Sequence, residues 1–108
     1  RVHGYQGEIV VGGFSGGIYD EARRGKFLNA DQPTDAIRAL VKENEWNKYR
    51  VVCQRDRLQT WVNGVKVTDL QDDMTKTGFI GLQVHGVGQK TEPLQVQWRN
   101  LRLKELKP

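Results

Sequence analysis

The sequence predicts an all-β fold, an antiparallel β-sandwich. Two observations support this prediction: apolar and polar residues alternate in several short segments, and turn-forming residues separate those segments. The clearest turn is Asn63-Gly64, because both positions of a type I′ turn need positive φ and this residue pair tolerates it. With 108 residues the chain is long enough for one domain with a modest core, so we expect a single domain over 1–108.

The sequence pattern of the first half of the chain predicts one strand, a loop and a short helix. Alternation from Tyr5 to Val11 is typical of a half-buried strand, and the glycines within 12–17 loosen the backbone after it. The charged run 20–26 is expected on a loop or a single helical turn. Apolar residues at helical spacing in 35–41 predict a short helix with Thr34 as its N-cap.

The second half predicts strands only. Tyr49 to Gln54 and Leu58 to Val62 alternate on either side of the Arg55-Asp56 turn, and the Asn63-Gly64 hairpin leads into 65–67. Cys53 is in phase with apolar neighbours, which predicts a buried, inert thiol rather than a nucleophile.

Two further strands are expected near the end of the chain. In the first, from Gly78, we expect Ile80, Leu82 and Val84 to be buried between sheets. The second runs from about 94 to 103, where the alternation slips at Asn100 as a bulge would produce, so that Leu101 and Leu103 take over the apolar face. Since the chain begins within a strand, we also expect upstream strands to be missing.

Composition excludes several functions. The net charge of +4 is spread among interleaved acids and bases, which argues against nucleic acid as a partner. One cysteine and two histidines do not supply the spacing of a structural zinc site, and no apolar stretch is long enough to span a membrane. The phosphate-cradling, nucleophile-elbow and HExxH motifs are also missing from the sequence.

Polar residues on two of the expected strands are candidates for a sugar site. Gln6 and Glu8 share one face of the first strand, and Gln83 and His85 share one face of the later strand. If both faces open on the same side, an acid, two amides and an imidazole form one surface. The alternative is an ordinary solvated sheet face, which is usually polar as well.

A second candidate is the run IYDEARRG. Asp20 and Glu21 lie close in sequence to Arg23 and Arg24, so that this segment has carboxylates for a metal or hydroxyls and guanidiniums for oxygen ligands. The alternative is a solvated loop with internal ion pairs, which contribute little stability.

Five segments, taken in order, resemble the 3-keto-disaccharide hydrolase family: GYQGEI (4–9), GGIYDEARRGK (16–26), EWNKYRVVCQRDRLQTWVNGVKVTD (45–69), GFIGLQVHG (78–86) and VQWRNLRLKEL (96–106). The resemblance implies a concanavalin A-like jelly roll that acts on 3-keto-glycosides, cleaving or hydrating them. It also implies export to the bacterial periplasm or exterior. Family domains usually carry further strands upstream, so this chain is expected to be the C-terminal part of a larger sandwich, with a second chain as one source of the missing strands.

The resemblance also suggests roles for individual residues. His85 would act as acid or base, and Glu8 and Asp20 would serve as a second base or bind a divalent metal ion. Arg23 or Arg24 would steady a developing oxyanion. The remaining candidates would hold the hydroxyls of an oligosaccharide or 3-keto-glycoside: Gln6, Tyr19, Glu21 and Gln83. The alternatives are a carbohydrate-binding module without turnover and a structural sandwich in a larger assembly.

Overall fold

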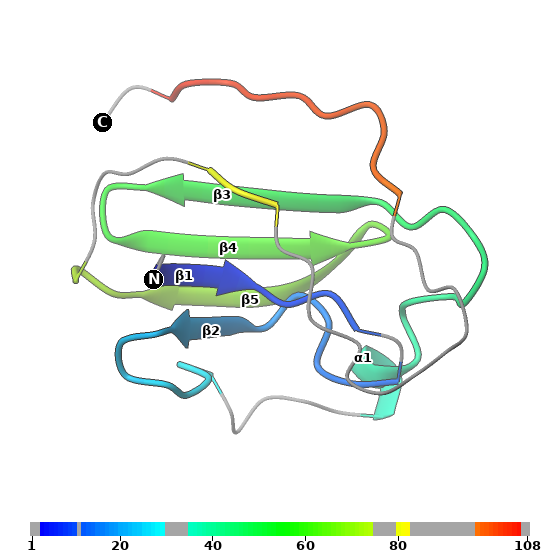
Figure 1. Ribbon diagram of the computed structural model, residues 1–108, viewed down its shortest axis with the longest axis horizontal. Helices are drawn as coiled ribbons and strands as arrows, with labels where there is room; N and C mark the ends of the chain where they lie inside the picture. Colours follow the sequence, from blue (N-terminus) through cyan, green and yellow to red (C-terminus); the bar gives the residue numbers. More distant parts are fainter. Residues whose placement is uncertain (1–2, 11, 30–34, 75–79, 83–96, 107–108) are drawn as a thin grey trace.

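The computed structural model describes residues 3–10, 12–29, 35–74, 80–82 and 97–106. Within them the chain is mostly β, with antiparallel sheets as the sequence predicts (Figure 1). The elements in order are β1 (Gly4–Gly7), β2 (Ile18–Glu21), α1 (Asp35–Arg38), β3 (Tyr49–Gln54), β4 (Arg57–Val62) and β5 (Val65–Gln71). Strands β1 and β2 form one sheet, and β3, β4 and β5 form the other in that order.

Two tight turns set the register of the three-stranded sheet. Asn63 and Gly64 have φ of 49° and 85°, which confirms the predicted hairpin between β4 and β5. Arg55, with φ of 57°, begins the turn between β3 and β4. A register shift between Thr60 and Trp61 disturbs the β4–β5 ladder. Alternate residues of β4 are buried, which gives this sheet an inner face.

The glycine-rich loop between β1 and β2 is buried against that inner face. Ser15 and Gly16 are both buried, although loops usually run over the surface. The backbone remains satisfied because the hydroxyls of Thr60 and Thr68 donate to the Gly16 carbonyl at 2.5 and 2.8 Å. Asn29 adds a bond from its Nδ2 to the Thr68 hydroxyl at 2.9 Å.

The apolar core lies beside this loop. It consists of Phe14, Val41, Val62 and Val67, and Ile37 and Leu40 pack against it from the helical segment. The apolar spacing predicted for 35–41 is therefore confirmed, although the helix itself ends at Arg38. The N-cap expected at Thr34 lies outside the described residues.

Several local predictions are wrong. The first strand ends at Gly7 rather than Val11, and Ile9 is exposed, since the chain turns into the glycine-rich loop. Asp20 and Glu21 lie in β2 rather than on a loop. Cys53 is exposed because the β3 strand, paired only with β4 in the described part, has no buried residue on either face.

The C-terminal predictions are also wrong where the structure describes them. Ile80 and Leu82 are 74% and 48% exposed instead of buried, while Val84 lies outside the described residues. Residues 97–106 form no strand, and Leu101 and Leu103 are exposed. Alternation in a sequence shows that a segment could be a strand, but a strand also needs a neighbour to complete its hydrogen bonds.

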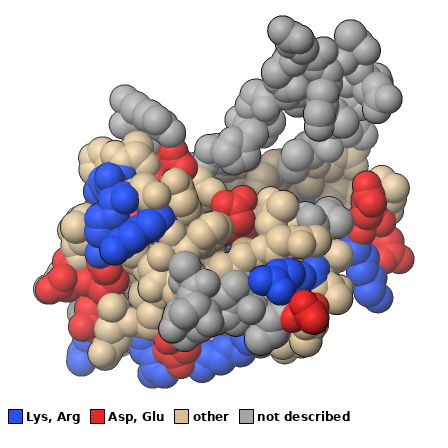
Figure 2. All heavy atoms as spheres, turned by 90° about the horizontal axis from the view of Figure 1, so that it is seen from below, with Lys and Arg blue, Asp and Glu red and all other residues tan. Residues whose placement is uncertain are grey.

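Charged side chains lie among uncharged ones on the face shown in Figure 2, where basic and acidic groups are close to each other. Among the helices that the structure describes, none is long and apolar enough to cross a membrane.

Candidate functional site

Most of the predicted site residues lie in or just after β1 and β2, and the register of this two-stranded ribbon divides those in the strands between two faces. Gln6 is paired with Tyr19, and Gly4 with Glu21, so these residues share one face. Tyr5 is paired with Asp20 on the other face. The two halves of the predicted site are therefore not adjacent on the ribbon.

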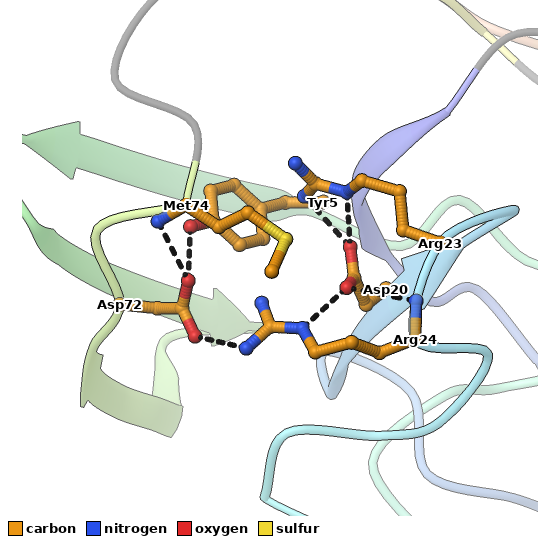
Figure 3. Close-up of polar contacts among 6 residues, drawn as sticks. All are labelled: Tyr5, Asp20, Arg23, Arg24, Asp72 and Met74. Carbon is orange, nitrogen blue, oxygen red and sulfur yellow. Dashed lines mark hydrogen bonds and ion pairs between the residues drawn. The ribbon is translucent and has the colours of Figure 1, made fainter.

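The first half is an arginine cluster, defined here as Tyr5, Asp20, Arg23, Arg24 and Asp72 (Figure 3). A turn at 22–24, with Ala22 at a φ of 58°, returns both arginines to the Asp20 carboxylate. Arg23 Nε donates to Asp20 Oδ1 at 2.8 Å, and Arg24 Nε donates to Oδ2 at 2.5 Å. The Asp20 side chain is fully buried beneath them.

Asp72, just after β5, completes the cluster from the other sheet. It accepts a bond from Arg24 Nη1 at 2.8 Å on one oxygen, and bonds from the Tyr5 hydroxyl and the Met74 amide on the other. The Arg23 guanidinium lies over the Tyr5 ring, 5.0 Å from its centroid. Arg24 is thus held between two carboxylates that come from opposite sheets.

These contacts fix the charge states in the cluster. Burial alone would raise the pKa of Asp20, but the hydrogen bonds from Arg24 and Arg23 outweigh it, and the pKa lies below its ordinary value. The hydrogen bond from Arg24 likewise lowers the pKa of Asp72. The pKa of Arg24 is raised, chiefly by Asp72 and then by Asp20. All three groups are charged at neutral pH.

The second half is the pair Gln6 and Glu8. Gln6 Nε2 donates to Glu8 Oε2 at 2.9 Å, so the structure brings these two predicted residues together. The Glu8 backbone is anchored to the glycine-rich loop by bonds with Gly16 and Gly17. Among the residues that the structure describes, none donates a hydrogen bond to the buried Gln6 Oε1, so the pair retains hydrogen-bonding capacity that this part of the chain does not use.

Glu8 also influences the partly buried phenol of Tyr49. Burial raises the pKa of Tyr49, the negative charge of Glu8 raises it further, and a hydrogen bond with the Ser15 hydroxyl opposes the shift. Tyr49 therefore stays protonated at neutral pH.

The other predicted residues have different surroundings. The Tyr19 ring meets Phe27 edge-on, with 5.2 Å between centroids, and Glu21 is half-buried at the end of β2. Gln83 and His85 lie outside the described residues, so their place beside Glu8 stays a prediction.

The described part of the chain contains no preformed site for a divalent metal ion. No three His, Cys, Asp or Glu side chains there are grouped closely enough to hold one. The Asp20 oxygens are already occupied by guanidiniums, and Glu8 is bonded to an amide. The residues described therefore do not fit a metal centre.

Sequence reasoning missed Tyr5 and Asp72 as members of the cluster. Tyr5 alternates in phase with apolar residues, which predicted only packing. Asp72 is separated from Arg24 by 48 positions, and nothing in the local sequence signals their contact.

Comparison with known proteins identifies a family for the chain. No curated protein matches it. A family model described as the 3-keto-alpha-glucoside-1,2-lyase-like domain matches residues 1–104, nearly the whole chain, in agreement with the resemblance carried by its sequence segments. The chain therefore belongs to the family of 3-keto-alpha-glucoside-1,2-lyase-like domains.

Proposed function

We propose that the protein breaks the glycosidic bond of 3-keto-glycosides by β-elimination, with hydration or hydrolysis as the overall outcome. The observation that carries this proposal is the family match over residues 1–104. The Gln6–Glu8 pair supports it, because it joins a carboxylate to an amide on a partly exposed part of the ribbon.

The chemistry needs a base, an acid and a group that stabilises negative charge. A ketone at C3 acidifies the C2 hydrogen, so a base can remove that proton and leave an enediolate. The electrons then form the C1–C2 double bond while the C1–O bond breaks. The departing oxygen takes a proton from an acid, and water can add at C1.

The roles are assigned to Glu8, to the residues on the ribbon face of Gln6 and Tyr19, and to Gln83 and His85. Glu8 is proposed as the base and His85 as the acid. Hydrogen bonds from Gln6, the Tyr19 hydroxyl and Gln83 would hold sugar hydroxyls and the developing oxyanion, with Glu21 farther along the same face.

Asp20 and the two arginines are given a supporting role in this proposal. Asp20 is a weak base, because its pKa is lowered and both of its oxygens accept bonds from guanidiniums. It positions Arg23 and Arg24 instead of transferring a proton.

The proposed architecture is a concanavalin A-like jelly roll in which the two sheets face each other. Contacts between them support it: a Cβ on Gly7 of β1 would lie 3.8 Å from Val51 of β3, and Gly16 bonds to Thr60 and Thr68.

One observation favours the alternative, a carbohydrate-binding module without turnover. Gln6 and Asp20 lie on opposite faces of the ribbon, so the predicted catalytic groups do not surround one pocket in the described residues.

The test is release of the aglycone from a chromogenic 3-keto-glucoside. We expect turnover by the wild type and a loss of about 10²–10⁴-fold in Glu8→Gln and in His85→Ala, because each removes a proton-transfer group. Glu43→Gln, which changes an exposed carboxylate, is the matched control. Binding of the intact glycoside without turnover would establish the alternative, and a variant that loses both activity and its thermal transition would show a structural role. The same assay with a chelator added tests whether turnover needs a metal ion.

A further inference from the structure

The arginine cluster has hydrogen-bonding capacity that its internal bonds do not use. Arg24 Nε donates a hydrogen bond to Asp20, and Arg24 Nη1 donates one to Asp72. Within the described residues, Nη2 of Arg24 has no partner. Among the described residues, Arg24 is the one donor to Asp72 Oδ2. The side chains of Arg24 and Asp72 are 29% and 14% exposed, so a ligand can reach both.

The charges in the cluster indicate what kind of ligand would suit these groups. Two guanidiniums face two carboxylates, so the cluster is close to neutral and has no net attraction for an anion. A free N–H donor beside a carboxylate acceptor matches two neighbouring hydroxyls, one accepting and one donating. Figure 3 shows the remaining Arg24 nitrogen directed toward Met74, whose half-exposed side chain offers an apolar surface for ring carbons.

We propose that Arg24 and Asp72 bind a pair of vicinal hydroxyls of a neutral sugar, at a site separate from Glu8. The two groups are held in place before the ligand arrives, because Asp20 fixes one edge of the guanidinium and the Tyr5 hydroxyl fixes the far oxygen of Asp72. Such preorganisation reduces the entropy lost on binding.

The site does not depend on the proposed catalysis. It lies on the Tyr5 and Asp20 face of the ribbon, whereas Gln6 lies on the other face. An unoxidised sugar is therefore a suitable probe, and its binding can be measured whether or not a 3-keto-glycoside is turned over.

The experiment is a titration of the protein with cellobiose. Calorimetry measures the binding, and NMR of the arginine Nε–H signals shows where it occurs. We expect saturable binding that shifts the Arg24 signal and leaves the Arg57 signal in place. Asp72→Asn and Arg24→Lys should each weaken binding by about tenfold, the loss expected for one charge-assisted hydrogen bond. Glu43→Gln should bind as the wild type does, because that exposed carboxylate lies outside the site.

The matched control is Asp69→Asn. Asp69 also binds an arginine, Arg57, at 2.9 and 2.8 Å, but this ion pair lies on the exposed β4–β5 surface. Its loss should leave cellobiose binding unchanged. The proposal fails if the wild type shows no saturable binding, if binding shifts the Arg57 signal instead, or if sulfate competes with the sugar. If a variant loses its thermal transition, its binding result is not used. The proposal is then tested by whether cellobiose shifts the Arg24 signal in the wild-type NMR titration.

Discussion

At the residue scale, Asp20 shows how a charge can be buried in a small β-domain. Its side chain is inaccessible to solvent, yet both oxygens accept hydrogen bonds from guanidiniums that remain partly exposed. The cost of burying the carboxylate is offset by these bonds and by the backbone amide of Arg24 at 3.2 Å. Asp20 thereby connects the ribbon, through Arg24, to Asp72 after β5.

We predict that Asp20→Asn lowers the free energy of unfolding by about 2 kcal/mol at pH 7. This is less than the ~3–5 kcal/mol for breaking a fully buried pair, because the guanidiniums are partly hydrated. Chemical denaturation measures the change. Asp35→Asn, in an exposed ion pair with Arg38, should have a much smaller effect, and equal losses would contradict the assigned role of burial.

The same residue predicts a pH dependence. The pKa of Asp20 is lower in the folded chain than its ordinary value of 3.8, so its stabilising contribution is fully present above that value. The contribution is lost as the pH falls through the lowered folded pKa. The stability difference between the wild type and Asp20→Asn should therefore shrink as unfolding is measured from pH 5 downward. A difference that grows toward low pH would reverse the assigned sign.

At the element scale, the glycine-rich loop packs closely against β4 and β5. Gly16 has a φ of 86°, and a Cβ added there would lie 2.8 Å from Val62 Cγ2. Gly12 in the same loop also has positive φ, 76°, but a Cβ there would meet no atom of the described residues within 4 Å. Comparison of Gly12 with Gly16 therefore separates two reasons for glycine, its positive φ and the lack of space for a Cβ.

We predict that Gly12→Ala costs about 1 kcal/mol from backbone strain alone. Gly16→Ala should cost about 2–4 kcal/mol, because it adds overpacking against Val62 and Val67 to the same strain. Thermal and urea unfolding of both variants measure the difference. Equal effects would mean that the loop moves away from the β4–β5 face without cost.

At the scale of the whole molecule, the sequence predicted what depends on neighbours along the chain. The Asn63-Gly64 hairpin and the three-stranded sheet around it follow from local turn chemistry and period-two alternation. Asp72 could not be assigned to the site, because its partners come from distant segments. The exposure of Cys53 also depends on what pairs with β3, which alternation does not specify.

The candidate site was predicted in parts for the same reason. Arg23 and Arg24 lie three and four positions from Asp20, so their pairing is a local property of the turn. The opposite orientation of Gln6 and Asp20 depends on the register of β1 with β2, which adjacent sequence does not determine.

Hydroxyls of the three-stranded sheet bond to the glycine-rich loop and to Asn29, which leads to the last prediction. Thr68 donates to the Gly16 carbonyl and accepts from Asn29 Nδ2, and it is fully buried. Thr68→Val keeps the shape but leaves the Asn29 donor without this partner, so we expect a loss of about 1–3 kcal/mol in unfolding free energy. Thr68→Ser retains the hydroxyl and should lose less. In the double variant with Asn29→Ala the losses should fall short of additive, because both changes remove the same bond. Additive losses, or a Val variant as stable as the wild type, would show that this bond does not stabilise the fold.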